Sequence, residues 1–122
     1  MLGSTYTEFG DAQGGFSTRL DVSTLYVKAW GFWDNDVAER FGPAVLDLCQ
    51  ATPGLRRLEF DMTELKPMRD EGQEGFGQIM GALADLPKLT VLVTTSSPLT
   101  KLQLLRIARE RAPSGAVQFT QV

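Results

Sequence analysis

The 122-residue chain has no histidine and only one cysteine, Cys49. Histidine is the commonest general base in enzymes and the commonest metal ligand in proteins. Its absence excludes Ser-His-Asp and Cys-His catalytic arrangements, and it leaves a zinc site almost without ligands. We therefore expect a protein that is not an enzyme and that holds no metal or other cofactor, although chemistry with carboxylates alone stays open.

A lone cysteine also excludes a disulfide within the chain, which is typical of proteins from a reducing compartment. The first residues lack the basic stretch and apolar run of a secretory signal. No run of about 20 apolar residues is present, so we expect no membrane span. These absences together predict a cytoplasmic protein.

Positive charge is not in excess either. The chain carries 12 basic and 15 acidic residues, a formal net charge of −3. Non-specific binding to nucleic acid needs a basic surface that neutralises phosphates, so we expect no nucleic-acid partner. The chain is 43% hydrophobic and 22% charged, which is ordinary for one globular domain of this length.

The order of strands and helices can be read from the spacing of apolar residues. Residues 1–15 are polar and contain glycine, and they form either a short edge strand or a loose segment before a single domain over residues 16–122. An antiparallel hairpin, three helices and three further strands follow. The expected strands and helices cover residues 16–21, 25–31, 34–52, 55–62, 70–86, 90–95, 98–111 and 116–120.

This order, β-β-α-β-α-β-α-β, predicts an α/β fold. Its mixed sheet has an antiparallel hairpin at the N-terminus, parallel central strands and three helices. Strand 90–95 is almost continuously apolar, which is typical of a strand buried on both faces of a parallel sheet. Pro43 lies inside the first helix and predicts either a kink or a break near Gly42.

Two further patterns concern surfaces. Trp30 and Phe32 share a face of their strand and are expected in the core, whereas Trp33 is the better candidate for exposure at an interface. In helix 98–111, Leu99, Leu102 and Leu105 line one face. The other side is basic and exposed, and it could meet an acidic partner or an anionic lipid headgroup, although a solvated face is commoner. The basic residues are Lys101, Arg106, Arg109 and Arg111.

Four glycines interrupt the helix over residues 70–86, and each interior glycine costs up to about 1 kcal/mol relative to alanine. We expect them to allow close packing of this helix on the sheet. A phosphate-binding loop is a poor alternative, because no Gly-Lys-Ser/Thr sequence closes the run. The glycines are Gly72, Gly75, Gly77 and Gly81.

The central stretch from Phe60 to Gly72 carries a resemblance to a known family. Asp61–Leu65 resembles the Asp-Leu-Ser-Gly-Val of the STAS domain, and Arg69–Gly72 falls on its Asp-Ser-Ser-Gly at matching spacing. Gly31–Asp34 resembles the Gly-x-hydrophobic-Asp before the family's first helix. The resemblance extends over about residues 16–119. STAS domains form bacterial anti-sigma-factor antagonists and the tails of sulfate transporters.

The resemblance implies a protein-interaction module that binds a regulatory protein, an anti-sigma factor or a kinase-like partner, through the loop before the second helix. In that family a partner kinase phosphorylates the serine before the motif's glycine, and Glu71 stands at that position here. Arg69 replaces the motif's opening aspartate. The resemblance and the neighbouring residues together give the expected partner-binding set: Trp33, Asp34, Asp61, Thr63, Arg69, Asp70, Glu71 and Gly72.

The replacement predicts that the phosphoswitch is absent, unless Thr63 serves instead. A simpler role for Thr63 is a strand-end hydroxyl that bonds to the turn. Asp70 and Glu71 should each stabilise the start of the second helix by up to about 1 kcal/mol through the helix dipole. A further hypothesis is that Glu71 imitates phosphoserine incompletely, with a charge of about −1 in place of −1.5 to −2.

A competing interpretation is small-molecule or lipid binding, as in STAS-like proteins that resemble Sec14 lipid carriers. An apolar pocket between the second and third helices would then hold an acyl chain or another apolar ligand, with the four glycines leaving room for it. An enzyme would instead need Asp61, Asp70 and Glu71 to converge on one cleft. A homodimer is also left open.

Overall fold

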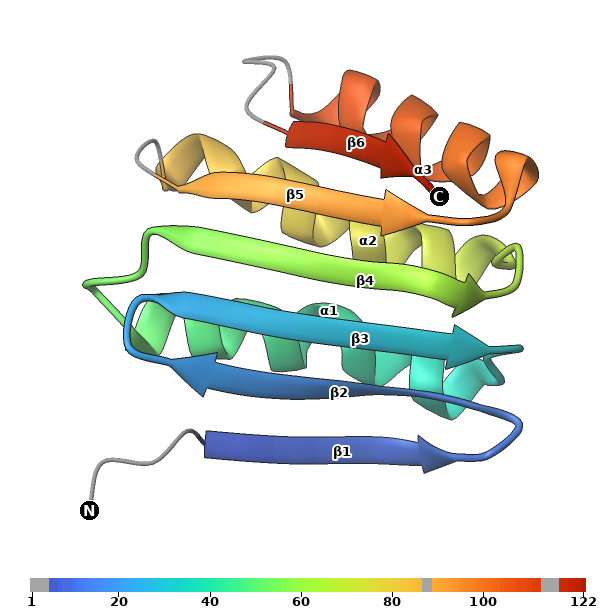
Figure 1. Cartoon of the computed structure of the whole chain (residues 1–122), viewed down its shortest axis with the longest axis horizontal. Coiled ribbons are helices and arrows are strands. Elements are labelled where there is room, and N and C mark those ends of the chain that lie inside the picture. The colour runs from blue at the N-terminus through green and yellow to red at the C-terminus, as the bar shows by residue number, and fades with distance from the viewer. Residues whose placement is uncertain (1–4, 87–88, 113–116) are drawn as a thin grey trace.

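The structure is a computed structural model, which describes residues 5–86, 89–112 and 117–122. One mixed sheet has the strand order β1-β2-β3-β4-β5-β6, antiparallel from β1 to β3 and parallel from β3 to β6 (Figure 1). This confirms the expected α/β class. The elements are β1 (Thr5–Asp11), β2 (Gly14–Asp21), β3 (Thr24–Gly31), α1 (Asn35–Ala51), β4 (Arg57–Leu65), α2 (Asp70–Ala82), a 3₁₀ turn (Leu83–Asp85), β5 (Thr90–Thr95), α3 (Pro98–Arg111) and β6 (Val117–Gln121).

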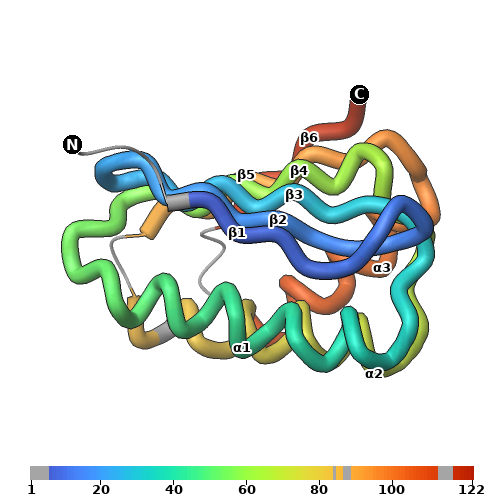
Figure 2. Tube along the Cα trace, turned by 90° about the horizontal axis from the view of Figure 1, so that it is seen from below, coloured from blue at the N-terminus to red at the C-terminus, as the bar shows by residue number. Residues whose placement is uncertain are grey.

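All three helices cover the same face of the sheet (Figure 2). Each strand pairs with the next one in the chain, and right-handed crossovers that always advance in one direction put every helix on one side. The expectation that β5 is buried on both faces is therefore wrong. Val91 and Val93 are buried beneath the helices, whereas Leu92 is only half-buried on the uncovered face.

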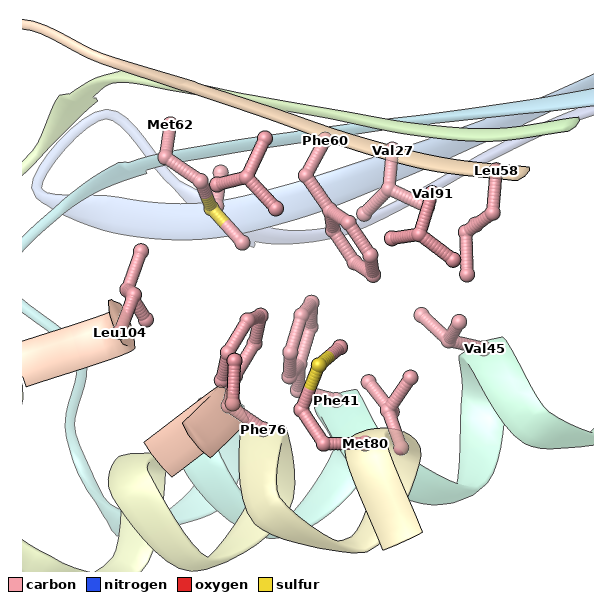
Figure 3. Close-up of a cluster of buried hydrophobic side chains, with 14 of the residues drawn as sticks. Val27, Phe41, Val45, Leu58, Phe60, Met62, Phe76, Met80, Val91 and Leu104 are labelled. Carbon is pink, nitrogen blue, oxygen red and sulfur yellow. The ribbon is translucent and has the colours of Figure 1, made fainter. Parts of the chain in front are cut away.

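The core lies between the covered face and the helices, where aromatic rings form its centre. Figure 3 shows Phe41 and Phe76 rising from the helices towards Phe60 of β4. The ring centroid of Phe60 lies 6.1 Å from that of Phe41 and 5.7 Å from that of Phe76, and all three side chains are at most 2% exposed. Edge-to-face and tilted contacts of this kind contribute about 0.5–1.5 kcal/mol each beyond the area that they bury.

The N-terminal segment is an edge strand, the first of the two alternatives left by the sequence, because residues 5–11 pair with β2. β2 and β3 form the expected hairpin, in which Asp21 lies opposite Thr24. Val22 and Ser23 make the turn, and Val22 has a φ of 55° with a side chain that is 90% exposed. A β-branched residue is unfavourable in this left-handed conformation.

Helix α1 runs without interruption through Pro43, which lies on its exposed side. Of the two alternatives, a break near Gly42 is therefore wrong. The Asp34 carboxylate caps the helix by accepting a hydrogen bond from the backbone N–H of Val37 at 3.0 Å. Aspartate is one of the residues preferred at this position, because its side chain satisfies a backbone N–H of the first helical turn.

The two largest differences between expected and observed boundaries are at C-terminal ends. β4 continues to Leu65 rather than ending near Met62, and the regular helix α2 ends at Ala82 rather than at Leu86. The last expected strand begins at Val117, and Ala116 lies outside the described residues.

The glycines of α2 allow close packing, although the partner is α1 rather than the sheet. A Cβ atom on Gly75 would lie 3.2 Å from the carbonyl oxygen of Ala38. A Cβ atom on Gly42 would lie 3.1 Å from the carbonyl oxygen of Gly75. Gly81, in contrast, faces open space, with no atom within 4 Å of such a Cβ. The two helices therefore approach each other through Gly42 and Gly75.

Replacing Val22 with asparagine should stabilise the protein. The left-handed conformation costs an ordinary residue about 1–2 kcal/mol and asparagine less, so the free energy of unfolding should rise by about 1 kcal/mol. Urea denaturation measures the change. Val122→Asn is the matched control at another exposed valine, and it should change stability by less than about 0.5 kcal/mol. Equal effects of the two substitutions would contradict the role of the turn.

A pair of glycine substitutions tests the helix contact. Gly81→Ala should raise the free energy of unfolding by up to about 1 kcal/mol, because it improves helix propensity without a clash. Gly75→Ala should lower it by about 1 kcal/mol, because the new methyl group presses on the backbone of α1. Thermal unfolding of both variants gives the comparison, and a gain at Gly75 would refute close packing there.

Candidate functional site

The candidate site lies where the parallel strands end, on the side of the molecule where the loops before α1, α2 and α3 meet (Figure 1). Open parallel sheets usually bind their ligands at this edge. Two hydrogen bonds join the loops across the strand ends. The backbone N–H of Lys66 donates to the carbonyl of Gly31 at 3.1 Å, and the Ser96 hydroxyl donates to the carbonyl of Thr63.

The loop before α2 is held by side chains from two helices. The Gln103 side chain accepts from the Met68 N–H at 2.8 Å and donates to the Met68 carbonyl at 3.1 Å. Gln73 donates to the same carbonyl at 2.9 Å, and the Thr100 hydroxyl donates to the carbonyl of Leu65 at 3.2 Å. Because its backbone groups are satisfied by side chains, this loop presents a fixed surface.

Two of the expected partner-binding residues meet at this edge. Arg69 and Asp34 line a shallow depression of about 380 Å³ together with Asn35 and Asp36. Arg69 is the N-cap residue of α2 but makes no side-chain cap, and it is exposed. The arginine that replaces the motif's aspartate therefore stands beside the acidic start of α1.

Asp70 and Glu71 begin α2 and lie on the wall of a second hollow, which we call the acidic groove. It has a volume of about 450 Å³ and runs between α1 and α2. Glu39 and Glu74 add two more exposed carboxylates to it, and only Glu74 forms an ion pair among the described residues, at 3.1 Å from Arg111. The full lining is Ala38, Glu39, Pro43, Asp70, Glu71, Glu74, Gly75 and Gln78.

The first-turn position of Asp70 and Glu71 agrees with a role in stabilising the helix dipole. The N-cap residue Arg69 makes no side-chain cap, so the acidic first turn is the favourable charge at this helix start. Gly72 is buried, and a Cβ atom there would lie 3.1 Å from the Cβ of Met68. Gly72 is thus a packing residue behind the surface that Asp70 and Glu71 expose.

Asp61 and Thr63 are not part of this surface. The Asp61 carboxylate accepts from the Thr63 hydroxyl at 2.7 Å and from its N–H at 3.1 Å, so Thr63 bonds within β4 rather than to the turn. A β-bulge lies here, because Lys28 pairs with Asp61 but Trp30 pairs with Glu64. Asp61 and Thr63 line a hollow of about 620 Å³ on the uncovered face. The three carboxylates required for an enzyme therefore do not converge, since Asp61 lies apart from Asp70 and Glu71.

The expected placement of the aromatic residues near α1 is wrong. Phe32 is 69% exposed, whereas Trp33 is half-buried, with its ring 4.7 Å from that of Phe41 and its indole N–H donating to the Gly15 carbonyl at 3.1 Å. Gly31 adopts a φ of 73°, which ends the strand alternation before Phe32. Trp30 is also only half-buried rather than in the core. Trp33 therefore supports α1 from inside, and Phe32 is the exposed aromatic.

Where the sequence predicts an apolar pocket between α2 and α3, the two helices are in contact at Gly77 and Arg111. Gly77 of α2 packs against α3 instead, since a Cβ there would lie 3.3 Å from the guanidinium carbon of Arg111. An apolar hollow of about 450 Å³ lies elsewhere, beyond the C-terminal ends of α1 and α2, and Cys49 and Leu89 line it. Burial raises the pKa of the Cys49 thiol to about 11, so the thiol is uncharged at neutral pH.

Within the described ranges, no three Cys, Asp or Glu side chains gather closely enough to hold a metal ion. No helix in the same part of the chain has the length and apolar character needed to cross a membrane. No protein-family model matches the chain, and no curated protein matches it.

Sequence reasoning missed Gln103 and Gln73, because a glutamine within a helix gives no signal of what its side chain will bond. Substituting Gln103→Leu should leave the buried Met68 N–H without a partner and lower the free energy of unfolding by about 1–2 kcal/mol. Hydrogen exchange at the Met68 amide should become faster. Gln50→Leu, an exposed position on α1, is the control. An unchanged exchange rate at the Met68 amide would show that the hydrogen bonds from Gln103 do not hold the loop.

Proposed function

We propose that this chain is a non-enzymatic, STAS-like interaction module that binds a basic segment of a regulatory protein through the acidic groove and the loop before α2. The observation that carries the proposal is the set of exposed carboxylates beside that loop, namely Glu39, Asp70, Glu71 and Glu74. Charged side chains arranged on one surface favour a partner of opposite charge and raise its association rate.

The fixed backbone of the loop supports this function. Met68 is held from both α2 and α3, so little ordering is needed when a partner binds. A prearranged surface loses less conformational entropy on association than a flexible one. The close contact of Gly42 with Gly75 likewise fixes the distance between the two walls of the groove.

Glu71 has a specific place in the proposal. By the resemblance to STAS domains it stands where a serine would be phosphorylated, and its side chain is exposed in the first turn of α2. A carboxylate there supplies a permanent negative charge of about −1, smaller than that of phosphoserine. We infer that the module stays in a state resembling the modified form, with no kinase needed to reach it.

Charge reversal tests the binding surface. A partner is first isolated by affinity purification from the native organism, and its dissociation constant is then measured for the wild type, Glu71→Lys and Asp47→Lys. Glu71→Lys should weaken binding by about tenfold or more and reduce its salt dependence. Asp47→Lys, which reverses an exposed carboxylate elsewhere on α1, should change affinity by less than about twofold.

Equal effects of the two reversals would contradict the proposed surface. Native mass spectrometry of the purified protein adds an independent check, because a co-purifying apolar molecule would favour the lipid-carrier interpretation instead. The mimicry of phosphoserine has its own test in Glu71→Ser, measured with and without the partner kinase. Unchanged affinity in that variant would refute the mimicry while leaving the binding surface intact.

A further inference from the structure

Helix α3 exposes its leucines. Leu99 is 58% and Leu102 62% exposed, and Leu105 is half-buried. The helix buries a smaller and partly polar stripe instead, composed of Thr100, Leu104, Ile107 and Ala108. Large apolar side chains that gather on one exposed face mark a site of interaction more often than isolated ones do.

Polar contacts explain why α3 cannot turn its leucines inward. Besides Gln103, Arg106 donates to the Gln73 side chain at 2.7 Å, and Arg111 pairs with Glu74 at 3.1 Å. These bonds attach one flank of α3 to α2 and to the loop before it. Any rotation that buried Leu102 would break them, so the exposed leucines are a fixed feature of the fold.

The exposed side chains form two parallel rows. Leu99, Leu102 and Leu105 are spaced three residues apart, which makes them one ridge of the helix surface. Gln103, Arg106 and Arg109 form the next ridge at the same spacing. A shallow groove of about 470 Å³ is lined by both ridges and by Glu110, and we call it the α3 groove.

Ridges and grooves of this kind are the surfaces by which helices pack against each other. With 14 residues, α3 offers a length of about 21 Å to a partner helix. The rim of the groove carries two guanidinium groups, Arg106 and Arg109, against the single carboxylate of Glu110. Its charge is thus complementary to an acidic partner, in contrast to the acidic groove between α1 and α2.

We propose that the α3 groove binds an acidic amphipathic helix of a partner protein, about three turns long. Its apolar side chains would pack along Leu102 and Leu105, and its carboxylates would pair with Arg106 and Arg109. A second copy of this chain fits less well, because it would bring two basic helices together. The proposal does not rest on the binding surface at the loop before α2.

The test uses a displayed library of helix-forming peptides with one leucine face and flanks that vary between glutamate and lysine. Peptides with glutamate flanks should be enriched on the wild-type protein. The substitution Leu102→Glu should weaken the binding of these peptides by about tenfold or more. The substitution Arg109→Glu should weaken the binding of the same peptides by about tenfold. The variant should instead prefer peptides with lysine at the positions that face residue 109.

The controls distinguish a loss of binding at the α3 groove from a loss caused by unfolding. Leu102 and Arg109 are exposed, so both variants should retain the melting temperature of the wild type. Two control variants should leave peptide affinity unchanged: Phe32→Glu, at an exposed apolar residue outside the lining of this groove, and Glu71→Lys. Loss of binding in Glu71→Lys alone would assign the peptides to the acidic groove and overturn the proposal.

Three other results would also overturn it. The first is enrichment of peptides without regard to flank charge. The second is sedimentation of the protein with vesicles containing anionic phosphatidylglycerol, but not with acidic peptides. The third is a concentration-dependent dimer that Leu102→Glu dissociates, since the leucine row would then be a contact between copies of this chain.

Discussion

The chain always advances in one direction across its sheet, and most other features depend on this constraint. Because each strand pairs with its successor, the crossovers place α1, α2 and α3 together on one face. Three helices in one layer must pack side by side as well as against the sheet. The glycine contact between α1 and α2 and the polar contacts between α2 and α3 meet that need, and the two grooves follow from them.

The two grooves differ in charge because different contacts hold the two helix pairs together. Between α1 and α2 the backbones touch through Gly42 and Gly75, so the nearby carboxylates stay on the rim of a narrow acidic groove. Between α2 and α3 the contacts are polar, and Arg106 reaches back to Gln73 while the leucines face outward. One layer of helices thus carries an acidic groove between α1 and α2 and a groove with basic and apolar side chains on α3.

Much of the fold could be predicted from the sequence, because local signals decide it. The β2–β3 hairpin, the Asp34 cap and the bounds of α3 follow from alternation, capping chemistry and the proline after Ser97. The one-sided sheet could not be predicted, since strand order depends on pairing between distant segments.

The orientation of α3 was missed for a similar reason. Leucine spacing predicts an apolar face, but the hydrogen bonds that Gln103 and Arg106 make to other elements decide where that face points. At the site, Arg69, Asp70 and Glu71 were found by motif, whereas the position of Trp33 depended on the φ of Gly31.

The uncovered face of the sheet has a consequence for how this protein can change over time. Every second side chain of the six strands points away from the helices, on a surface roughly 24 Å wide. Substitutions at Tyr26, Lys28 or Thr94 alter that surface without disturbing the aromatic core on the other side. The exposed positions of this face can therefore acquire new recognition properties, while the buried positions keep the fold. The architecture thus separates the core residues, which the fold requires, from the exposed residues of the uncovered face, which can be substituted without loss of the fold.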